Sequence, residues 1–262
     1  MITLKKLYKT LTKRFNLKLQ EKWDRCGIKL FGSWDKIVNK VIVCLDCNIQ
    51  VIKEAIKGKY DVIISHHPIF TKYKNISVSH IDLKVLKELS KNRIDLISLH
   101  TCVDNSEFGL NHYLVKMLNL HNLTYVKNTE GSYYIGHFLK SFKFDDLLQI
   151  INRTFKTLNV RYIKKTNVIN TIVFCSGSGF SVLKPDLKTF DKNLLIITGD
   201  IKWHDWILVN DLKISTLDIG HDVEKYFNDL ISEYLKSVFS QLTIKKIYPK
   251  IKILTLKSDY NL

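Results

Sequence analysis

Proline and glycine are scarce in this chain, with three prolines and ten glycines in 262 residues. This scarcity excludes collagen-like and low-complexity classes, and no Pro/Gly-rich linker divides the chain into independent parts. Five cysteines are an odd number that does not suit a disulfide framework. Because no secretory signal is recognisable either, we expect a reducing, cytoplasmic location. No apolar run approaches the roughly 20 residues that cross a bilayer, so we expect no membrane association.

Acidic residues are also few, with 25 Asp and Glu against 41 Lys and Arg, which gives a formal net charge of +16. The lysines are scattered through nearly every segment instead of forming one block. This scatter favours a solvated basic surface over a dedicated nucleic-acid face, and no helix-turn-helix or zinc-finger motif is present. We therefore consider nucleic acid an unlikely partner, whereas an anionic small molecule is favoured by the charge.

Short apolar runs alternate with amphipathic stretches, a pattern that predicts an α/β fold with mostly parallel sheets. The predicted strands are 40–46, 60–65, 94–99, 132–139, 160–163, 171–175, 194–197, 214–219 and 250–256. The predicted helices are an amphipathic one at the start of the chain and then 49–57, 81–92, 108–118, 145–155, 204–210 and 223–239. We expect two similar α/β halves, 1–127 and 128–262, in a single integrated unit. The part from about 220 to 262 is expected to pack back on the first half.

Polar clusters follow four of these strands, where open α/β sheets bind their ligands. The clusters are His66-His67, His100 to Asp104, Gly199-Asp200 with His204 soon after, and Gly220-His221 to Glu224. One such cluster could be only a turn with exposed histidines, but several at strand ends favour a metal site. Imidazole and carboxylate ligands together suit Zn²⁺, Fe²⁺, Mn²⁺ or Ni²⁺ better than Ca²⁺ or Mg²⁺.

Individual members of these clusters have alternative interpretations. His66 and His67 would point to opposite faces of a strand, but they follow the strand, where a turn before Pro68 can bring both imidazoles to neighbouring positions. His100 is either a third imidazole of the site, a partner that orients Asp104, or a buried histidine at a strand end. His221 and Glu224 lie three residues apart at the opening of the last long helix, where Glu224 could also simply complement the helix dipole.

The chain resembles the family of GTP cyclohydrolase I type 2 homologues, also called the NIF-three-like family. The matching segments occur in the family's order and are WDRCG (23–27), CLDCNIQVIKEAI (44–56), DVIISHHPIF (61–70), SLHTCVDNSEFGLNHYL (98–114), TGDIKWHDW (198–206) and LDIGHDVEKYF (217–227). The resemblance implies two intertwined three-layer α/β halves, a dinuclear metal site in the cleft between them, and a ring-shaped homohexamer. It assigns the metal ligands to His66, His67, Asp104, His221 and an acid after His221.

That last acid departs from the family pattern, which places Glu four residues after the histidine, where this chain has Lys225. Glu224 comes one residue early, about 100° away around an ideal α-helix. We expect Glu224 to complete the site, with Asp222 as the alternative. Asp200 stands where the family usually has Glu, and His204 matches a family histidine.

The polar clusters predict a metal-binding protein, and the resemblance implies that it binds two divalent metal ions. Together they lead us to expect a hydrolase of cyclohydrolase or phosphoesterase type. The expected substrate is a nucleotide or another phosphorylated small molecule. A divalent ion lowers the pKa of bound water toward about 7, which would supply a nucleophile. His100 or His204 would move protons. The alternative is a non-catalytic metal-binding or regulatory protein.

Overall fold

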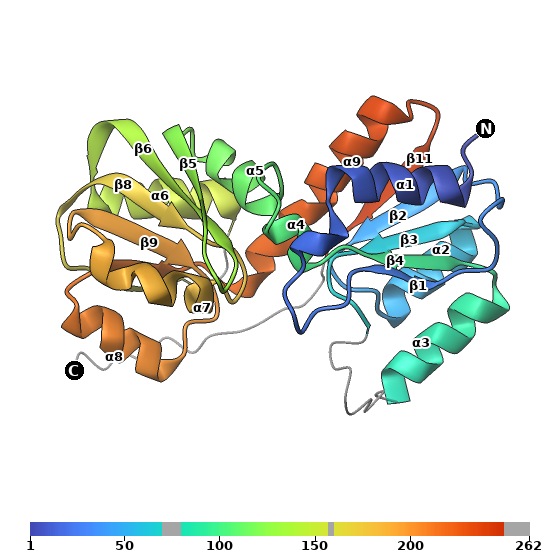
Figure 1. Ribbon diagram of the computed structural model, residues 1–262, viewed down its shortest axis with the longest axis horizontal. Coiled ribbons are helices and arrows are strands. Elements are labelled where there is room, and N and C mark those ends of the chain that lie inside the picture. The colour runs from blue at the N-terminus through green and yellow to red at the C-terminus, as the bar shows by residue number, and fades with distance from the viewer. Residues whose placement is uncertain (70–79, 157–159, 249–262) are drawn as a thin grey trace.

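A computed structural model describes residues 1–69, 80–156 and 160–248, which form two β-sheets flanked by helices (Figure 1). The first sheet has the strand order β1-β4-β3-β2-β11. Its strands are β1 (Gly27–Leu30), β2 (Lys40–Cys44), β3 (Val62–Ser65), β4 (Asp95–Ser98) and β11 (Thr243–Ile247). Strands β2, β3, β4 and β11 are parallel, and β1 is an antiparallel edge strand.

Helices cover both faces of this sheet because its central strands are apolar on both sides. Val41 and Val43 belong to one hydrophobic cluster with α1 (Leu4–Arg14) and α9 (Phe227–Val238). Ile42 and Cys44, which point the other way, belong to a second cluster with α2 (Ile49–Gly58) and α3 (His80–Lys91). Side chains alternate between faces along a strand, so this near-continuous apolar sequence marks a sheet buried on both sides.

The second sheet has six strands in the order β5-β6-β8-β9-β10-β7. These are β5 (His121–Lys127), β6 (Ser132–Lys143), β7 (Arg161–Ile163), β8 (Val168–Phe174), β9 (Leu194–Thr198) and β10 (Ser215–Asp218). Its centre, β8-β9-β10, is parallel, and the remaining pairs are antiparallel. One face packs on α5 (Leu110–Met117) and α6 (Phe144–Phe155), and the other on α7 (Phe180–Leu183) and α8 (Trp203–Asp211).

The two sheets share one large hydrophobic cluster. It contains Val43 and Ile64 of the first sheet together with Ile172, Ile197 and Leu217 of the second. Helix α9 follows the second sheet and leads to β11, which pairs with β2 in the first sheet. The chain therefore returns to its first sheet after building the second. The division into halves at residues 127 and 128 remains a prediction.

The structure confirms the mixed α/β class with two sheets, and most of the elements that the sequence predicts. Strands β1, β5 and β11 are absent from the sequence prediction, and the strand predicted at 250–256 lies outside the described residues. The long helix predicted at 223–239 begins only at Phe227, after the 3₁₀-helix η3 (His221–Tyr226). Two further 3₁₀-helices, η1 (Leu17–Leu19) and η2 (Lys184–Thr189), and the short α4 (Thr101–Asp104) complete the elements of the described chain. Among the residues that can be described, no helix combines the length and apolarity that bilayer crossing requires.

Candidate metal centre

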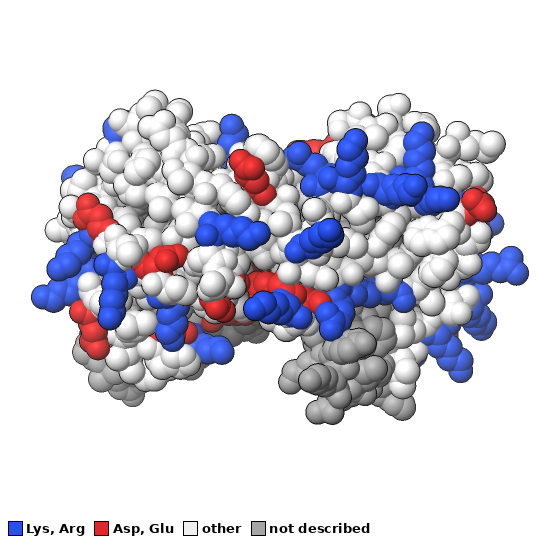
Figure 2. Space-filling model, viewed as in Figure 1, with Lys and Arg blue, Asp and Glu red and all other residues white. Residues whose placement is uncertain are grey.

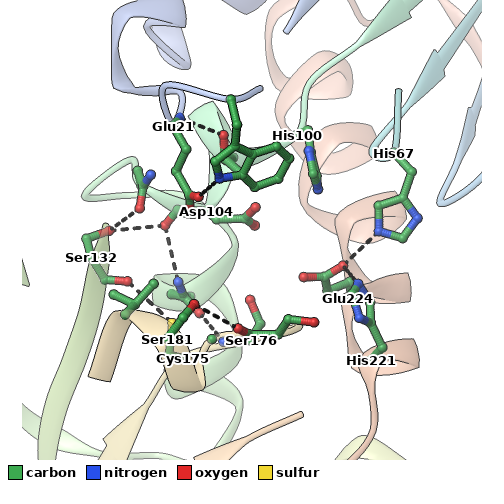
Figure 3. Close-up of a pocket in the computed structure, with 17 residues that line it drawn as sticks. Glu21, His67, His100, Asp104, Ser132, Cys175, Ser176, Ser181, His221 and Glu224 are labelled. Atoms are coloured by element: carbon green, nitrogen blue, oxygen red, sulfur yellow. Dashed lines mark hydrogen bonds and ion pairs between the residues drawn. The ribbon is translucent and has the colours of Figure 1, made fainter. Parts of the chain in front are cut away.

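The carboxyl ends of the parallel strands open on one cavity of about 350 Å³ (Figure 3). Residues after β3, β4 and β8 line it, as do His221 and Glu224 of η3. Both sheets therefore contribute side chains to the cavity wall, which lies beyond the carboxyl ends of strands from each sheet.

His66 is fully buried directly after β3. Its Nδ1 lies 3.0 Å from the carbonyl oxygen of Leu99, and because a carbonyl only accepts, Nδ1 carries the ring proton. Its Nε2 is left as an acceptor without a hydrogen-bond partner among the described residues. Burial lowers the pKa of His66 to about 4, so the ring is neutral near pH 7 and its Nε2 lone pair is available to a metal ion.

His67 and His221 are each oriented by an outer carboxylate. His67 Nδ1 lies 2.7 Å from Asp46 Oδ1, and His221 Nδ1 lies 2.6 Å from Asp200 Oδ2. Each Nδ1 donates to its carboxylate, so each Nε2 points inward, as in the carboxylate–histidine arrangement of metal sites. Burial opposes the charged form of His67, but hydrogen bonds to Asp46 and to Glu224 of η3 outweigh it and raise the pKa to about 10.

Glu224 lies at the centre of the cluster and is 4% exposed. Its Oε2 lies 3.0 Å from His67 Nε2, 2.9 Å from His221 Nε2 and 3.5 Å from His66 Nε2. Burial raises the pKa of the Glu224 carboxyl, but the surrounding imidazoles outweigh burial and hold it well below its usual range. Three ring nitrogens thus converge on one carboxylate oxygen.

Glu224 reaches this position because residues 221–226 form a 3₁₀-helix and not an α-helix. With three residues per turn, side chains at i and i+3 eclipse, so His221 and Glu224 share one side. Gly220, with φ of +83°, makes the turn from β10 into η3 in a backbone region that favours glycine. The prediction that His221 and Glu224 open the last long α-helix is wrong, because they belong to the 3₁₀-helix that precedes it. In this tighter helix an acid three residues after His221, one residue earlier than in the family pattern, lies on the same side as the histidine.

Asp104 ends α4 and faces the same cluster. Its Oδ2 lies 3.6 Å from His66 Nε2, and its buried Oδ1 has no hydrogen-bond partner among the described residues. Burial, reinforced by the negative charge of Glu224, raises the pKa of Asp104 well above its usual range. A buried carboxylate oxygen without a donor is unfavourable unless a cation or proton compensates it.

His100 lies beside the cluster and contacts both His66 and His67, with ring centroids 5.1 and 5.4 Å apart. Its Nδ1 lies 3.2 Å from Oδ1 of the fully buried Asp24, and Trp23 packs edge-on against its ring. Asp24 is fixed by the backbone and hydroxyl of Thr101. His100 thus lies at the cavity wall beside Asp24, although its Nδ1 has no hydrogen-bond partner among the described residues.

Two candidate residues from the sequence lie elsewhere. His204 is on α8, where its side chain is 66% exposed and its Nε2 lies 3.4 Å from Asp205, and it is not among the cavity-lining residues. Asp222, the alternative to Glu224, pairs at 3.1 Å with Lys225. Lys225, at the position where the resemblance implies Glu, is likewise outside the cluster.

Six side chains form three groups with the chemistry to hold a metal ion. The groups are His66-His67-His100, His67-His221-Glu224 and His66-Asp104-Glu224, and in each the possible ligand atoms lie within 4.8 Å of one another. The unpartnered His66 Nε2 and Asp104 Oδ1 are acceptors that a cation would satisfy. The donor set therefore fits a divalent transition metal.

Sequence reasoning missed several residues of this site. Asp46 lies two residues after the end of β2, just as His66 follows β3, and this position after a strand is a signal in the sequence. The loop of residues 175–179, which follows β8, also reaches the cavity. Its sequence contains glycines and serines but no histidine or acid, so it does not indicate a metal site. Asp24 gave no signal beyond its place in the WDRCG segment, since it lies in an irregular stretch before β1.

Similar proteins of known sequence match this chain over most of its length. The chain is 31% identical to a GTP cyclohydrolase 1 type 2 homolog of Ureaplasma parvum over 252 residues, covering 93% of this chain and 94% of that protein. It is 27% identical to a GTP cyclohydrolase 1 type 2 of Helicobacter pylori, covering 97% of this chain and all of that protein.

Solved structures show the same architecture. Reduced HcgD from Methanocaldococcus jannaschii superimposes with a TM-score of 0.80 and 26% identity, covering 94% of this chain and 97% of that one. The family model described as Duf34/NIF3 (NGG1p interacting factor 3) matches residues 2–252. The chain therefore belongs to the Duf34/NIF3 family.

Proposed function

We propose that this protein binds two divalent metal ions at the cluster and uses them in a hydrolase-type reaction on a phosphorylated or nucleotide-type small molecule. The observation that carries the proposal is the position of Glu224, which belongs to two of the three candidate ligand groups. One group adds His67 and His221, and the other adds His66 and Asp104. A carboxylate shared by two such groups suits a bridge between two cations.

The residues of the site would have different roles in this function. His66, His67, Asp104, His221 and Glu224 would hold the ions, with Asp46 and Asp200 fixing the rings of His67 and His221. When bound, such ions supply an activated water molecule and positive charge next to a substrate. His100, whose Nδ1 lies 3.2 Å from Asp24 Oδ1, lines the cavity and is the residue suited to move a proton there. His204 has no part in this proposal, because its side chain does not line the cavity.

Metal-loaded protein should hydrolyse a phosphoester or nucleotide, and the Asp104→Asn protein should lose both metal content and turnover. Metal analysis and a panel of phosphoester and nucleotide substrates provide the test. Absence of turnover in fully loaded protein would contradict catalysis. It would favour the alternative, a non-catalytic metal-binding or regulatory role, in which Asp104→Asn lowers metal content and changes no reaction.

The outer carboxylates should tune metal affinity without being ligands. We expect Asp46→Asn and Asp200→Asn each to weaken metal binding by about 10- to 100-fold, because the imidazole loses an anionic partner that raises its basicity. Asp222→Asn is the matched control, since Asp222 pairs with Lys225 and, among the residues that the structure describes, with no histidine. Competition with a chelator measures the affinities. Equal affinities in all three variants would contradict the assigned ring orientations.

The family resemblance also leads us to propose a ring-shaped homohexamer in the cytoplasm. Each chain has a mass of 30.7 kDa. Sedimentation equilibrium should therefore give six times this mass, and a monomer or dimer mass at micromolar concentration would contradict the proposal.

A further inference from the structure

The loop after β8 forms a serine- and glycine-rich wall of the same cavity. Its residues 175–179 read Cys-Ser-Gly-Ser-Gly, and Ser181 and Ser132 line the cavity beside it. Figure 3 shows Ser176 between Ser181 and the Glu224 carboxylate. This wall places hydroxyl groups next to the candidate metal centre, and none of its residues belongs to the candidate ligand groups.

The Ser176 hydroxyl is the most informative group of this wall. Ser176 is 6% exposed, and its Oγ has no hydrogen-bond partner among the described residues. Its backbone N–H donates to Asn111 Oδ1 at 2.7 Å, so the main chain that carries the hydroxyl is fixed. Buried polar groups in native proteins are normally hydrogen-bonded, so this hydroxyl beside the cavity has hydrogen-bonding capacity that a ligand group can complete.

The charge of the cavity limits what this ligand group can be. None of its 17 described lining residues is Lys or Arg, although the chain has 41 such residues, whereas Glu21, Asp104 and Glu224 are acidic. Figure 2 shows acidic side chains at the waist of the molecule, with Lys and Arg side chains beside them on the outer surface. Two divalent ions would bring four positive charges and the three carboxylates remove three, which leaves a net charge of +1. One phosphate group, at about −1.5 to −2, exceeds this by roughly one charge at most, whereas a triphosphate exceeds it by several.

We propose that the cavity binds its small-molecule substrate through a single phosphate group, placed between the metal ions and the Ser176 hydroxyl, and that it selects against nucleoside triphosphates. This inference rests on the proposed two-metal function and narrows its substrate class. Hydroxyl donors and metal ions replace the Arg and Lys side chains that usually hold phosphate. GTP, which appears in the names of the relatives, carries more negative charge than this cavity balances.

In the test, inorganic phosphate is titrated into the metal-loaded full chain, and isothermal titration calorimetry measures its affinity. We expect Ser176→Ala to weaken phosphate binding about tenfold, the loss typical of one hydrogen bond to a charged group, with unchanged metal content. Ser237→Ala is the control, because that exposed serine of α9 donates to the Tyr234 carbonyl. Acetate should bind more weakly than phosphate to the unsubstituted protein. Equal phosphate affinity in Ser176→Ala and the unsubstituted protein, or stronger binding of acetate, would overturn the inference.

Selectivity gives a second, independent measurement. Guanosine monophosphate should bind the loaded protein at least about tenfold more tightly than guanosine triphosphate. Ser181→Lys, which adds a cation at the cavity wall, should narrow this difference. Triphosphate binding as tight as monophosphate binding, with both metals retained, would contradict the charge argument. Metal content distinguishes failure of the proposed function from failure of this inference. Protein that cannot hold two ions refutes both. Metal-loaded protein whose phosphate affinity is unchanged by Ser176→Ala refutes the inference alone.

Discussion

Replacement of Glu224 by glutamine should remove both metal ions from the protein. Glu224 Oε2 lies within 3.5 Å of three imidazole Nε2 atoms, and the side chain belongs to two of the candidate ligand groups. Glutamine keeps the shape but loses the charge and directs an N–H donor or a weaker acceptor at the centre. Since loss of even an outer partner weakens metal sites 10- to 100-fold, we expect the affinity to fall by at least about 100-fold. Metal analysis after dialysis measures the loss.

A second substitution tests the position of this carboxylate. Lys225→Glu, made together with Glu224→Gln, restores an acid four residues after His221, as in the family pattern. In a 3₁₀-helix the next residue lies about 120° farther round the axis, so we expect no recovery of metal binding. Full recovery would contradict the 3₁₀ geometry of η3. The melting temperature of each variant, compared with that of the metal-free unsubstituted protein, shows whether the fold is retained.

Replacement of Gly177 by alanine should have the second large effect on the site. A Cβ atom built at Gly177 would lie 2.0 Å from Glu224 Oε1, and Gly177 has a φ of +58°, in the region that favours glycine. The new methyl group therefore displaces the Glu224 carboxylate from the imidazoles. We expect loss of metal binding, together with a destabilisation of the metal-free protein of roughly 1 kcal/mol from the backbone conformation.

Gly32→Ala is the matched control for this substitution. A Cβ at Gly32 meets no atom within 4 Å, and the residue has no positive φ, so metal content should stay at its original value. A thermal melt of the metal-free proteins should show Gly177→Ala lower by about 2–4 °C. Retention of both ions by Gly177→Ala at the original affinity would mean that the Glu224 carboxylate is not needed where the structure places it.

Much of the site is predictable because strand ends are readable in the sequence. The buried strand β3 is a short apolar run, whereas β10 is equally buried but reads Ser-Thr-Leu-Asp. His66, His67 and His221 follow these two strands within a few residues. Parallel strands bring such ends to one edge of a sheet, so the strand pattern marks each cluster as a ligand-binding position. Because β3 and β10 belong to different sheets, the pattern alone does not predict that His221 lies beside His66 and His67. The apolar runs also identify β2, β4, β8 and β9.

The remaining features of the site and fold depend on local backbone geometry that the spacing of apolar residues does not reveal. A His-x-x-Glu segment is compatible with the first turn of an α-helix or with a 3₁₀-helix, and only the latter eclipses Glu224 with His221. Strand β11 reads Thr-Ile-Lys-Lys-Ile, and its adjacent lysines interrupt the apolar pattern, as edge strands often do. Asp46 lies inside a CxxC segment that directs attention to its cysteines, Cys44 and Cys47, which are buried free thiols.

Glu224 would be shared by two metal ions, one held together with His67 and His221 and the other with His66 and Asp104. Anomalous diffraction from crystals of protein purified without added metal, recorded at the absorption edges of Zn, Fe, Mn and Ni, tests it most directly. We predict two anomalous peaks, one near His67 and His221 and the other near His66 and Asp104, with the Glu224 carboxylate between them. A single peak, or two peaks with Glu224 turned away from both, would contradict the account.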